Sequence, residues 1–205
     1  MTDDSELDRL RTGGEIALAE RIEVDRERLR RIIAFRMDHR LVGRLDPGDV
    51  LQELFLEARH RLERYVEDPG VPVFVWLRGL LLEILIRLHR KHLQTRKRDA
   101  GVEVSLDAIG SNASSIPQLA RHLADGGLTP GHLMQRVERS SLIESALQQL
   151  EEHDRALLTL RHFEQLSNDE VARILGVKKA AASRRYTRAL VRLREALGDS
   201  ISGDG

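Results

Sequence analysis

Apolar positions along this chain recur at the three- and four-residue spacing of amphipathic helices, and no convincing alternation of apolar and polar positions appears. Residues 15–39 predict one long helix, or two with a slight break. A second helix is predicted over 47–65, because Asp46 is a natural N-cap and Pro47 suits the first helical position. A third begins near Val73, and its almost wholly apolar first half should be buried. The apolar positions of the first helix are Ile16, Leu18, Ala19, Ile22, Leu29, Ile32, Ile33 and Phe35.

The pattern changes after the third helix. Gly, Ser, Asn and Pro punctuate residues 99–138, which predicts a linker with room for one short helix at 116–123. Apolar positions resume over 142–163 and predict two helices that support a final helical pair. We therefore expect an all-α protein with two small domains. An N-terminal helical bundle would span 1–98, and a C-terminal four-helix domain would span 139–200.

The final pair, residues 167–197, has the pattern of a helix-turn-helix. Ser167 and Glu170 form a capping box, and Gly176 ends the first helix because glycine adopts the left-handed conformation at low cost. Eight Lys or Arg and no acid lie between Arg173 and Arg194, so the second helix suits a DNA major groove. The alternative is an ordinary helical hairpin with a solvated basic face. The predicted buried stripe is Ala182, Tyr186, Ala189, Leu190, Leu193 and Leu197.

The net charge is zero, but acidic and basic blocks alternate along the chain. Residues 71–98 and 171–205 are basic, whereas 1–70 and 99–170 are acidic. Screening over about 8–10 Å lets each block act on its own surroundings. The two basic blocks therefore predict two separate contacts with one polyanion.

Composition narrows the classes of protein further. The chain has no cysteine, which excludes a disulfide framework and a thiolate site. The first residues, MTDDSELD, are acidic and lack the apolar core of a signal peptide. The longest apolar run, Gly79 to Leu88, is too short to span a bilayer. These features predict a cytoplasmic location.

Three segments together resemble a known family. DVLQELF at Asp49–Phe55 is similar to the DxxQExF signature of bacterial sigma factors, and VWLRGLLLEIL at 75–85 resembles the tryptophan- and leucine-rich helix that follows it. Residues 166–194 resemble the DNA-reading helix-turn-helix of the same family. Two such domains with a variable linker resemble the small extracytoplasmic-function (ECF) group.

The resemblance implies a protein that binds core RNA polymerase and directs it to promoters, with no catalytic residue, metal or cofactor. It also allows an anti-sigma partner, which would cover the same polymerase-binding surfaces. The polymerase contacts it implies are Asp49, Gln52, Glu53 and Phe55. The contacts with the melted downstream promoter element are Phe74, Trp76, Arg78, Arg87, His89, Arg90, Lys91 and Arg96, with a flipped base held by the loop 67–74. The contacts with the duplex upstream element are Lys178, Lys179, Ser183, Arg184, Arg185 and Arg188.

Some positions depart from the family pattern. Many members carry Asn where Glu83 stands and Asp where Arg87 stands. Ala180–Ala182 replaces the usual Gly-Thr-Val, and three alanines make few specific contacts except with thymine methyl groups. Only Phe74 and Trp76 lie near the first basic block as stacking partners for bases. We therefore expect a downstream pocket that captures few bases.

Two other classes of protein compete with this interpretation. A conventional helix-turn-helix regulator with an N-terminal sensing domain explains 167–197 equally well, but not the second basic block or the acidic helix after Asp49. An enzyme could use His89 and His92, which lie three apart on a helix and could ligate a metal. No third-ligand pattern, HExxH motif or Gly-rich phosphate loop accompanies them.

Overall fold

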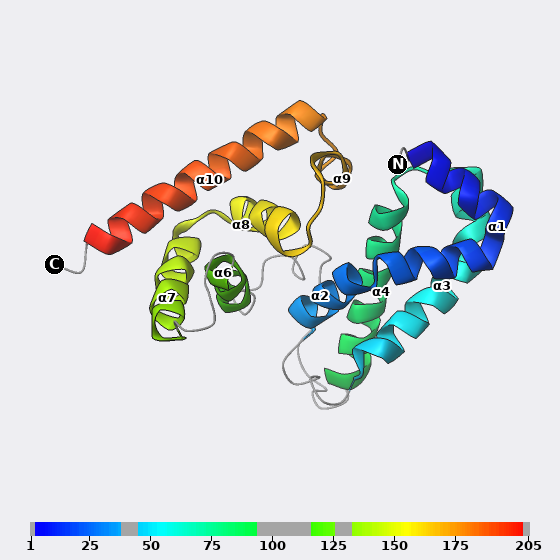
Figure 1. The fold of residues 1–205 in the computed structure, drawn as a ribbon, viewed down its shortest axis with the longest axis horizontal. Helices are drawn as coiled ribbons and strands as arrows, with labels where there is room; N and C mark the ends of the chain where they lie inside the picture. The colour runs from blue at the N-terminus through cyan, green and yellow to red at the C-terminus, as the bar shows by residue number, and fades with distance from the viewer. Residues whose placement is uncertain (1–2, 38–44, 94–115, 126–132, 203–205) are drawn as a thin grey trace. The chain divides into compact units, whose positions relative to one another are not determined.

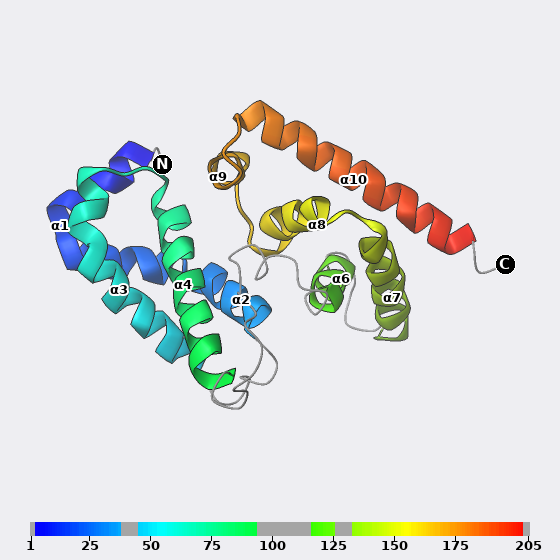
Figure 2. The same cartoon turned by 180° about the vertical axis from the view of Figure 1, so that it is seen from behind.

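The structure is a computed structural model that describes residues 3–37, 45–93, 116–125 and 133–202 (Figure 1). All the elements in these ranges are helices, which confirms the predicted all-α class. The chain divides into two compact units, residues 1–109 and 110–205. Each unit has its own set of buried apolar residues, and Figure 2 shows the same helices from behind.

The first unit is a bundle whose central member is the helix α4. The unit contains α1 (Asp3–Val24), α2 (Arg26–Arg36), α3 (Pro47–Glu67) and α4 (Val73–Leu93). α1, α2 and α3 all pack against α4. The apolar first half of α4 is buried as predicted, with Leu77, Leu81, Ile84 and Leu85 inaccessible to solvent. Burial of each such side chain contributes about 1.5–3 kcal/mol, so α4 anchors the unit.

Local sequence signals set the ends of these helices. Asp46 caps α3 as predicted, and its carboxylate accepts a hydrogen bond from the Gly48 N–H at 2.5 Å. The predicted long helix is two helices, broken at Asp25, and α1 begins at Asp3, well before the predicted start. Gly14 bends α1 with a φ of 52°.

The break between α1 and α2 holds a buried carboxylate. Asp25 is 3% exposed, and its oxygens lie 2.6 Å from Arg21 and 3.3 Å from Arg28. Burial raises the pKa of Asp25 even though both arginines act to lower it. The Arg28 guanidinium also lies 3.5 Å from the centre of the Phe74 ring. This chain of contacts ties the helix break to the start of α4.

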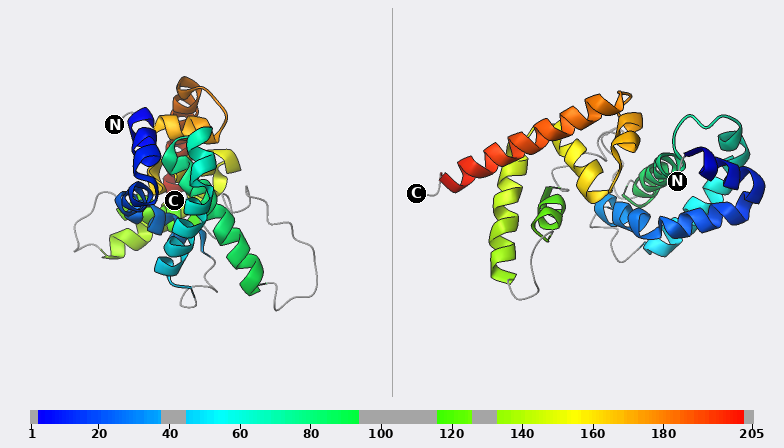
Figure 3. Two further views of the ribbon diagram at one scale, coloured as in Figure 1. Left: turned by 90° about the vertical axis from the view of Figure 1, so that its right-hand side faces the viewer. Right: turned by 45° about the horizontal axis from the view of Figure 1, so that its top comes forward.

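The second unit places a helix-turn-helix on a helical support. Its elements are α6 (Ile116–Asp125), α7 (Leu133–Gln149), α8 (Glu152–Leu158), the π-helix η3 (Thr159–Phe163), α9 (Asn168–Ile174) and α10 (Lys179–Ser202). α10, orange to red in Figure 3, packs against α7, α8 and α9. α6 forms within the predicted linker and packs on α7 and η3, so this part of the segment adds to the second unit's core.

The predicted capping box and glycine turn are confirmed. Ser167 Oγ accepts a hydrogen bond from the Glu170 N–H at 3.2 Å, while the Glu170 carboxylate accepts one from the Ser167 N–H at 2.6 Å. Gly176 has a φ of 61°. The Val177 N–H donates to the Ala172 carbonyl at 2.9 Å, which completes a Schellman motif. Within the predicted stripe of α10, Ala182, Ala189 and Leu193 are buried and Tyr186, Leu190 and Leu197 are half-buried.

A pair of histidines joins α6, η3 and α10. The His162 Nε2 atom lies 2.9 Å from the Tyr186 hydroxyl, and the His162 carbonyl oxygen lies 3.0 Å from the His122 Nε2 atom. Arg161 lies 5.2 Å from the centre of the Tyr186 ring. Burial lowers the pKa of His162 below its ordinary value of 6.5, and the charges of Arg161 and His122 act in the same direction.

Acid should therefore destabilise the second unit. Because the folded pKa of His162 is lowered, the unfolded chain binds more protons, so the stabilisation is complete above pH 6.5 and is lost as pH falls toward the folded pKa. We expect the urea midpoint of the second unit, followed by its NMR signals, to fall between about pH 7.5 and 5.5. His162→Gln should reduce this pH dependence, whereas the control His60→Gln, at an exposed histidine of the first unit, should not. Equal pH dependence in all three proteins would contradict the role of His162.

Gln165, which follows η3, has a strained backbone conformation. It has a φ of 56°, a left-handed conformation that is unfavourable for a residue with a Cβ atom. Relative to Gln165→Ala, which removes the same side-chain atoms beyond Cβ, Gln165→Gly should stabilise the second unit by about 0.5–1 kcal/mol, net of glycine's greater freedom in the unfolded chain. Urea denaturation measures the change. Gln165→Ala keeps the Cβ atom and should give no gain, so equal gains from both substitutions would show that φ is not the cause.

Candidate docking groove and nucleic-acid interface

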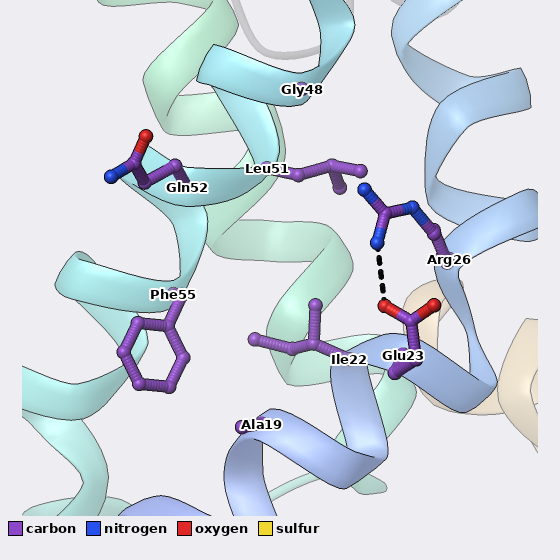
Figure 4. Close-up of a pocket in the computed structure, with 8 residues that line it drawn as sticks. All are labelled: Ala19, Ile22, Glu23, Arg26, Gly48, Leu51, Gln52 and Phe55. Carbon is purple, nitrogen blue, oxygen red and sulfur yellow. Dashed lines mark hydrogen bonds and ion pairs between the residues drawn. The ribbon is translucent and has the colours of Figure 1, made fainter.

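A groove of about 270 Å³ lies between α1 and the first half of α3 (Figure 4). Two of the predicted polymerase contacts, Gln52 and Phe55, line it, whereas Asp49 and Glu53 are not among its lining residues. Sequence reasoning missed the remaining lining residues. These are Ala19, Ile22, Glu23, Arg26, Gly48 and Leu51.

The groove combines an apolar floor with polar edges. Figure 4 shows Phe55, Leu51 and Ile22 around one space, with Gln52 at its edge and Glu23 of α1 paired with Arg26, the first residue of α2. The Glu23 and Arg26 side chains are 2.6 Å apart. Ile16 on α1, one of the apolar positions of the first predicted helix, is 74% exposed. In the sequence, this segment has apolar residues at Ile16, Leu18, Ala19 and Ile22, more than one narrow buried stripe requires. That surplus was the sequence signal that α1 has an exposed apolar surface.

A ladder of alternating charges follows the seam between α3 and α4. Arg87 on α4 lies 2.7 Å from Glu53 and 3.9 Å from Glu57, both on α3. Arg61 lies 2.6 Å from Glu57 and 2.9 Å from Glu83. Desolvation acts to lower the pKa of Arg61, but its hydrogen bonds to Glu57 and Glu83 raise it overall. The two α4 positions that depart from the family pattern, Glu83 and Arg87, are therefore both ion-paired with α3.

The predicted aromatic contacts are largely occupied within the first unit. Phe74 is 2% exposed and lies beneath Arg28, so its ring is not available to a base in this structure. Trp76 is half-buried and stacks on Tyr65, with ring centres 4.1 Å apart. The Tyr65 hydroxyl also donates to the Val71 carbonyl at 2.7 Å. These contacts hold both ends of the loop 67–74 that was predicted to receive a flipped base.

The basic residues predicted on α4 differ in exposure. Arg90 and Lys91 are exposed near the end of α4, and His89 is half-buried. Arg78 is only 9% exposed. Arg96 lies outside the described residues. The exposed basic side chains Arg90 and Lys91 therefore lie toward the C-terminal end of α4.

The basic residues in and next to the recognition helix α10 are of two kinds, those that form ion pairs and those that do not. Arg184, Arg185 and Arg188 on α10, and Lys178 just before it, are exposed and have no ion-pair partner within the described ranges. Lys179 differs, because its Nζ lies 2.6 Å from the Asp169 carboxylate on α9. Ser183 is half-buried. The unpaired arginines thus form an exposed cationic face near the start of α10.

Arg192 on the same helix has a structural partner. It hydrogen-bonds the carboxylate of Asp154, which is 3% exposed at the start of α8. The hydrogen bond to Asp154 raises the pKa of Arg192, and the negative charge of Asp154 adds to the effect. This pair fixes α10 against its support, so Arg192 holds the helix rather than presenting charge to a ligand.

The described ranges contain no group of three or more His, Asp or Glu side chains that could hold a metal ion. None of the helices described is long and apolar enough to cross a membrane.

Comparison with known proteins points to one family. Residues 140–193, which include α9, the glycine turn and most of α10, match the family model for sigma-70, region 4. The chain is 26% identical to the RNA polymerase sigma-H factor of Pseudomonas aeruginosa, over 90% of this chain and 92% of that protein. It is 22% identical to the ECF RNA polymerase sigma factor SigW of Bacillus subtilis, over 94% of this chain and 95% of that protein.

A solved structure has the same fold. CnrH, in its complex with the cytosolic domain of CnrY, matches with a TM-score of 0.50 and 19% sequence identity, over 96% of this chain and 97% of that one. The family match and the two relatives confirm the resemblance to the extracytoplasmic-function sigma factors, with residues 140–193 matching sigma-70 region 4.

Proposed function

We propose that the protein is a sigma factor that binds core RNA polymerase and directs it to promoters for transcription initiation in the cytoplasm. The observation that carries this proposal is the match of residues 140–193 to sigma-70 region 4, on the unit whose α10 exposes unpaired arginines. α10 would read the upstream promoter element as duplex, and the basic end of α4 would contact the melted downstream element.

The groove between α1 and α3 would receive a helical segment of the polymerase. Its apolar floor, with Phe55 and Ile22, and its amide at Gln52 suit an amphipathic helix laid into a groove. Burial of an aromatic anchor such as Phe55 supplies about 1.5–3 kcal/mol. Asp49 and Glu53 lie on the same helix outside the groove and would contact cationic groups beside the docked helix.

Duplex recognition would divide the exposed cations of α10 by position. Residues near the start of a recognition helix reach base edges, whereas later ones reach phosphates. Lys178 and Arg184 are therefore assigned to bases, and Arg185 and Arg188 to phosphates. A bidentate Arg–guanine pair discriminates against a wrong base by about 1–3 kcal/mol.

Contact with the melted strand would rely on charge more than on stacking. Arg90 and Lys91 are exposed, whereas Phe74 is covered by Arg28 and Trp76 by Tyr65. Since aromatic platforms supply most base stacking in single-strand binding, few bases would be held. Phe74 would contribute by packing in the core at the end of the loop 67–74, and not by stacking on a base.

The docking groove is tested by co-elution with core RNA polymerase. Gln52→Ala/Phe55→Ala removes the amide and the aromatic anchor together and should weaken binding by at least about tenfold, the loss typical of a central aromatic contact. His60→Ala removes an exposed side chain of α3 outside the groove and should leave binding unchanged. Tight duplex binding by the free chain, with no core binding, would instead favour a conventional regulator.

The recognition helix is tested with the polymerase holoenzyme on promoter fragments selected from a random pool. Arg188→Ala should weaken binding to all fragments alike and reduce the slope of log affinity against log salt by about one. Arg184→Ala should relax the selected sequence at one position, at a cost of about 1–3 kcal/mol. Uniform, sequence-independent losses from both variants would contradict the assignment of Arg184 to a base.

A further inference from the structure

Two residues that the family resemblance assigns to different partners contact each other directly. Glu53 was assigned to the polymerase and Arg87 to DNA, yet the Glu53 Oε1 atom accepts a hydrogen bond from Arg87 at 2.7 Å. Their side chains are 37% and 50% exposed, so a binding partner can reach either one. While the pair is intact, Arg87 neutralises the carboxylate that a cation of the polymerase would bind. Glu53 likewise neutralises the guanidinium that a DNA phosphate would bind.

We propose that Glu53 withholds Arg87 from DNA in the free chain and releases it when Glu53 docks on polymerase, so that the two binding events strengthen each other. This inference rests on the proposed function. A cation of the polymerase that pairs with Glu53 takes the carboxylate from Arg87, and the guanidinium is then available to a phosphate. Linkage requires that DNA bound at Arg87 strengthens polymerase binding by the same factor.

The rest of the ladder limits how fully Glu57 can replace Glu53. Glu57 lies 3.9 Å from Arg87 but only 2.6 Å from Arg61, so its carboxylate is already engaged. Arg61 is held in turn by Glu83 at 2.9 Å. Loss of Glu53 therefore leaves Arg87 with its weaker contact alone. An exposed pair of this kind supports a coupling of about two- to fivefold.

The proposal is tested by whether substitution of Arg87 raises or lowers the affinity for core polymerase. Arg87→Gln removes the competitor for Glu53, so the full-length chain should bind core polymerase about two- to fivefold more tightly in fluorescence titrations. The same substitution should have no effect on a Glu53→Gln background. Arg87→Lys keeps the charge and should behave much like the wild type. Arg64→Gln is the control, because Arg64 is an exposed arginine of α3 outside the groove and without an ion-pair partner in the described part of the chain.

A second measurement uses the assembled holoenzyme and a labelled random-sequence single-stranded oligonucleotide. Here Arg87→Gln should weaken binding and lower its salt dependence, the reverse of its effect on core binding. Thermal melting of each variant checks that the α3–α4 pair remains folded.

The outcomes distinguish failure of the Glu53–Arg87 inference from failure of the proposed sigma-factor function. Unchanged or weaker core binding by Arg87→Gln, with normal wild-type binding, overturns the inference and leaves the sigma-factor function standing. Tightening that persists on the Glu53→Gln background also overturns it, because Arg87 would then act by another route. Failure of the wild type to bind core polymerase overturns both the inference and the proposed function.

Discussion

Burial of the first half of α4 is the constraint on which the first unit depends. Leu77, Leu81, Ile84 and Leu85 are inaccessible to solvent, and α1, α2 and α3 all pack around them. A helix enclosed in this way leaves little surface for ligands, so its function is restricted to the seam with α3 and to its basic end. The same burial sets α3 beside α1 and so forms the groove that includes Gln52 and Phe55.

Charge pairing determines which cations remain for nucleic acid. Composition alone counts every Lys and Arg equally, but in the folded chain some of them form ion pairs and others do not. Arg192 is held by Asp154, Lys179 by Asp169 and Arg87 by Glu53, whereas Arg184, Arg185 and Arg188 have no ion-pair partner among the described residues. These three arginines lie on one helix of the unit that matches region 4. Pairing across helices thus leaves only part of the chain's positive charge available to nucleic acid.

The sequence predicted features whose causes lie within a few residues. The Asp46 cap, the capping box of Ser167 and the turn at Gly176 depend on short-range backbone geometry, and all are confirmed. Features that depend on contacts between distant segments could not be predicted. The cover over Phe74 comes from Arg28 on another helix, and the groove needs α1 to lie beside α3. α6 likewise gains its place by packing on α7 and η3.

The stacked pair of Tyr65 and Trp76 has a practical consequence. Trp76 is the chain's single tryptophan, and its ring lies 4.1 Å from Tyr65 with the planes 8° apart. The two rings belong to the residues that flank the loop 67–74, so they join its two ends. The intrinsic indole emission of the whole protein therefore arises at this loop. A change in that emission when DNA is added would report the opening of the stack, without any introduced label.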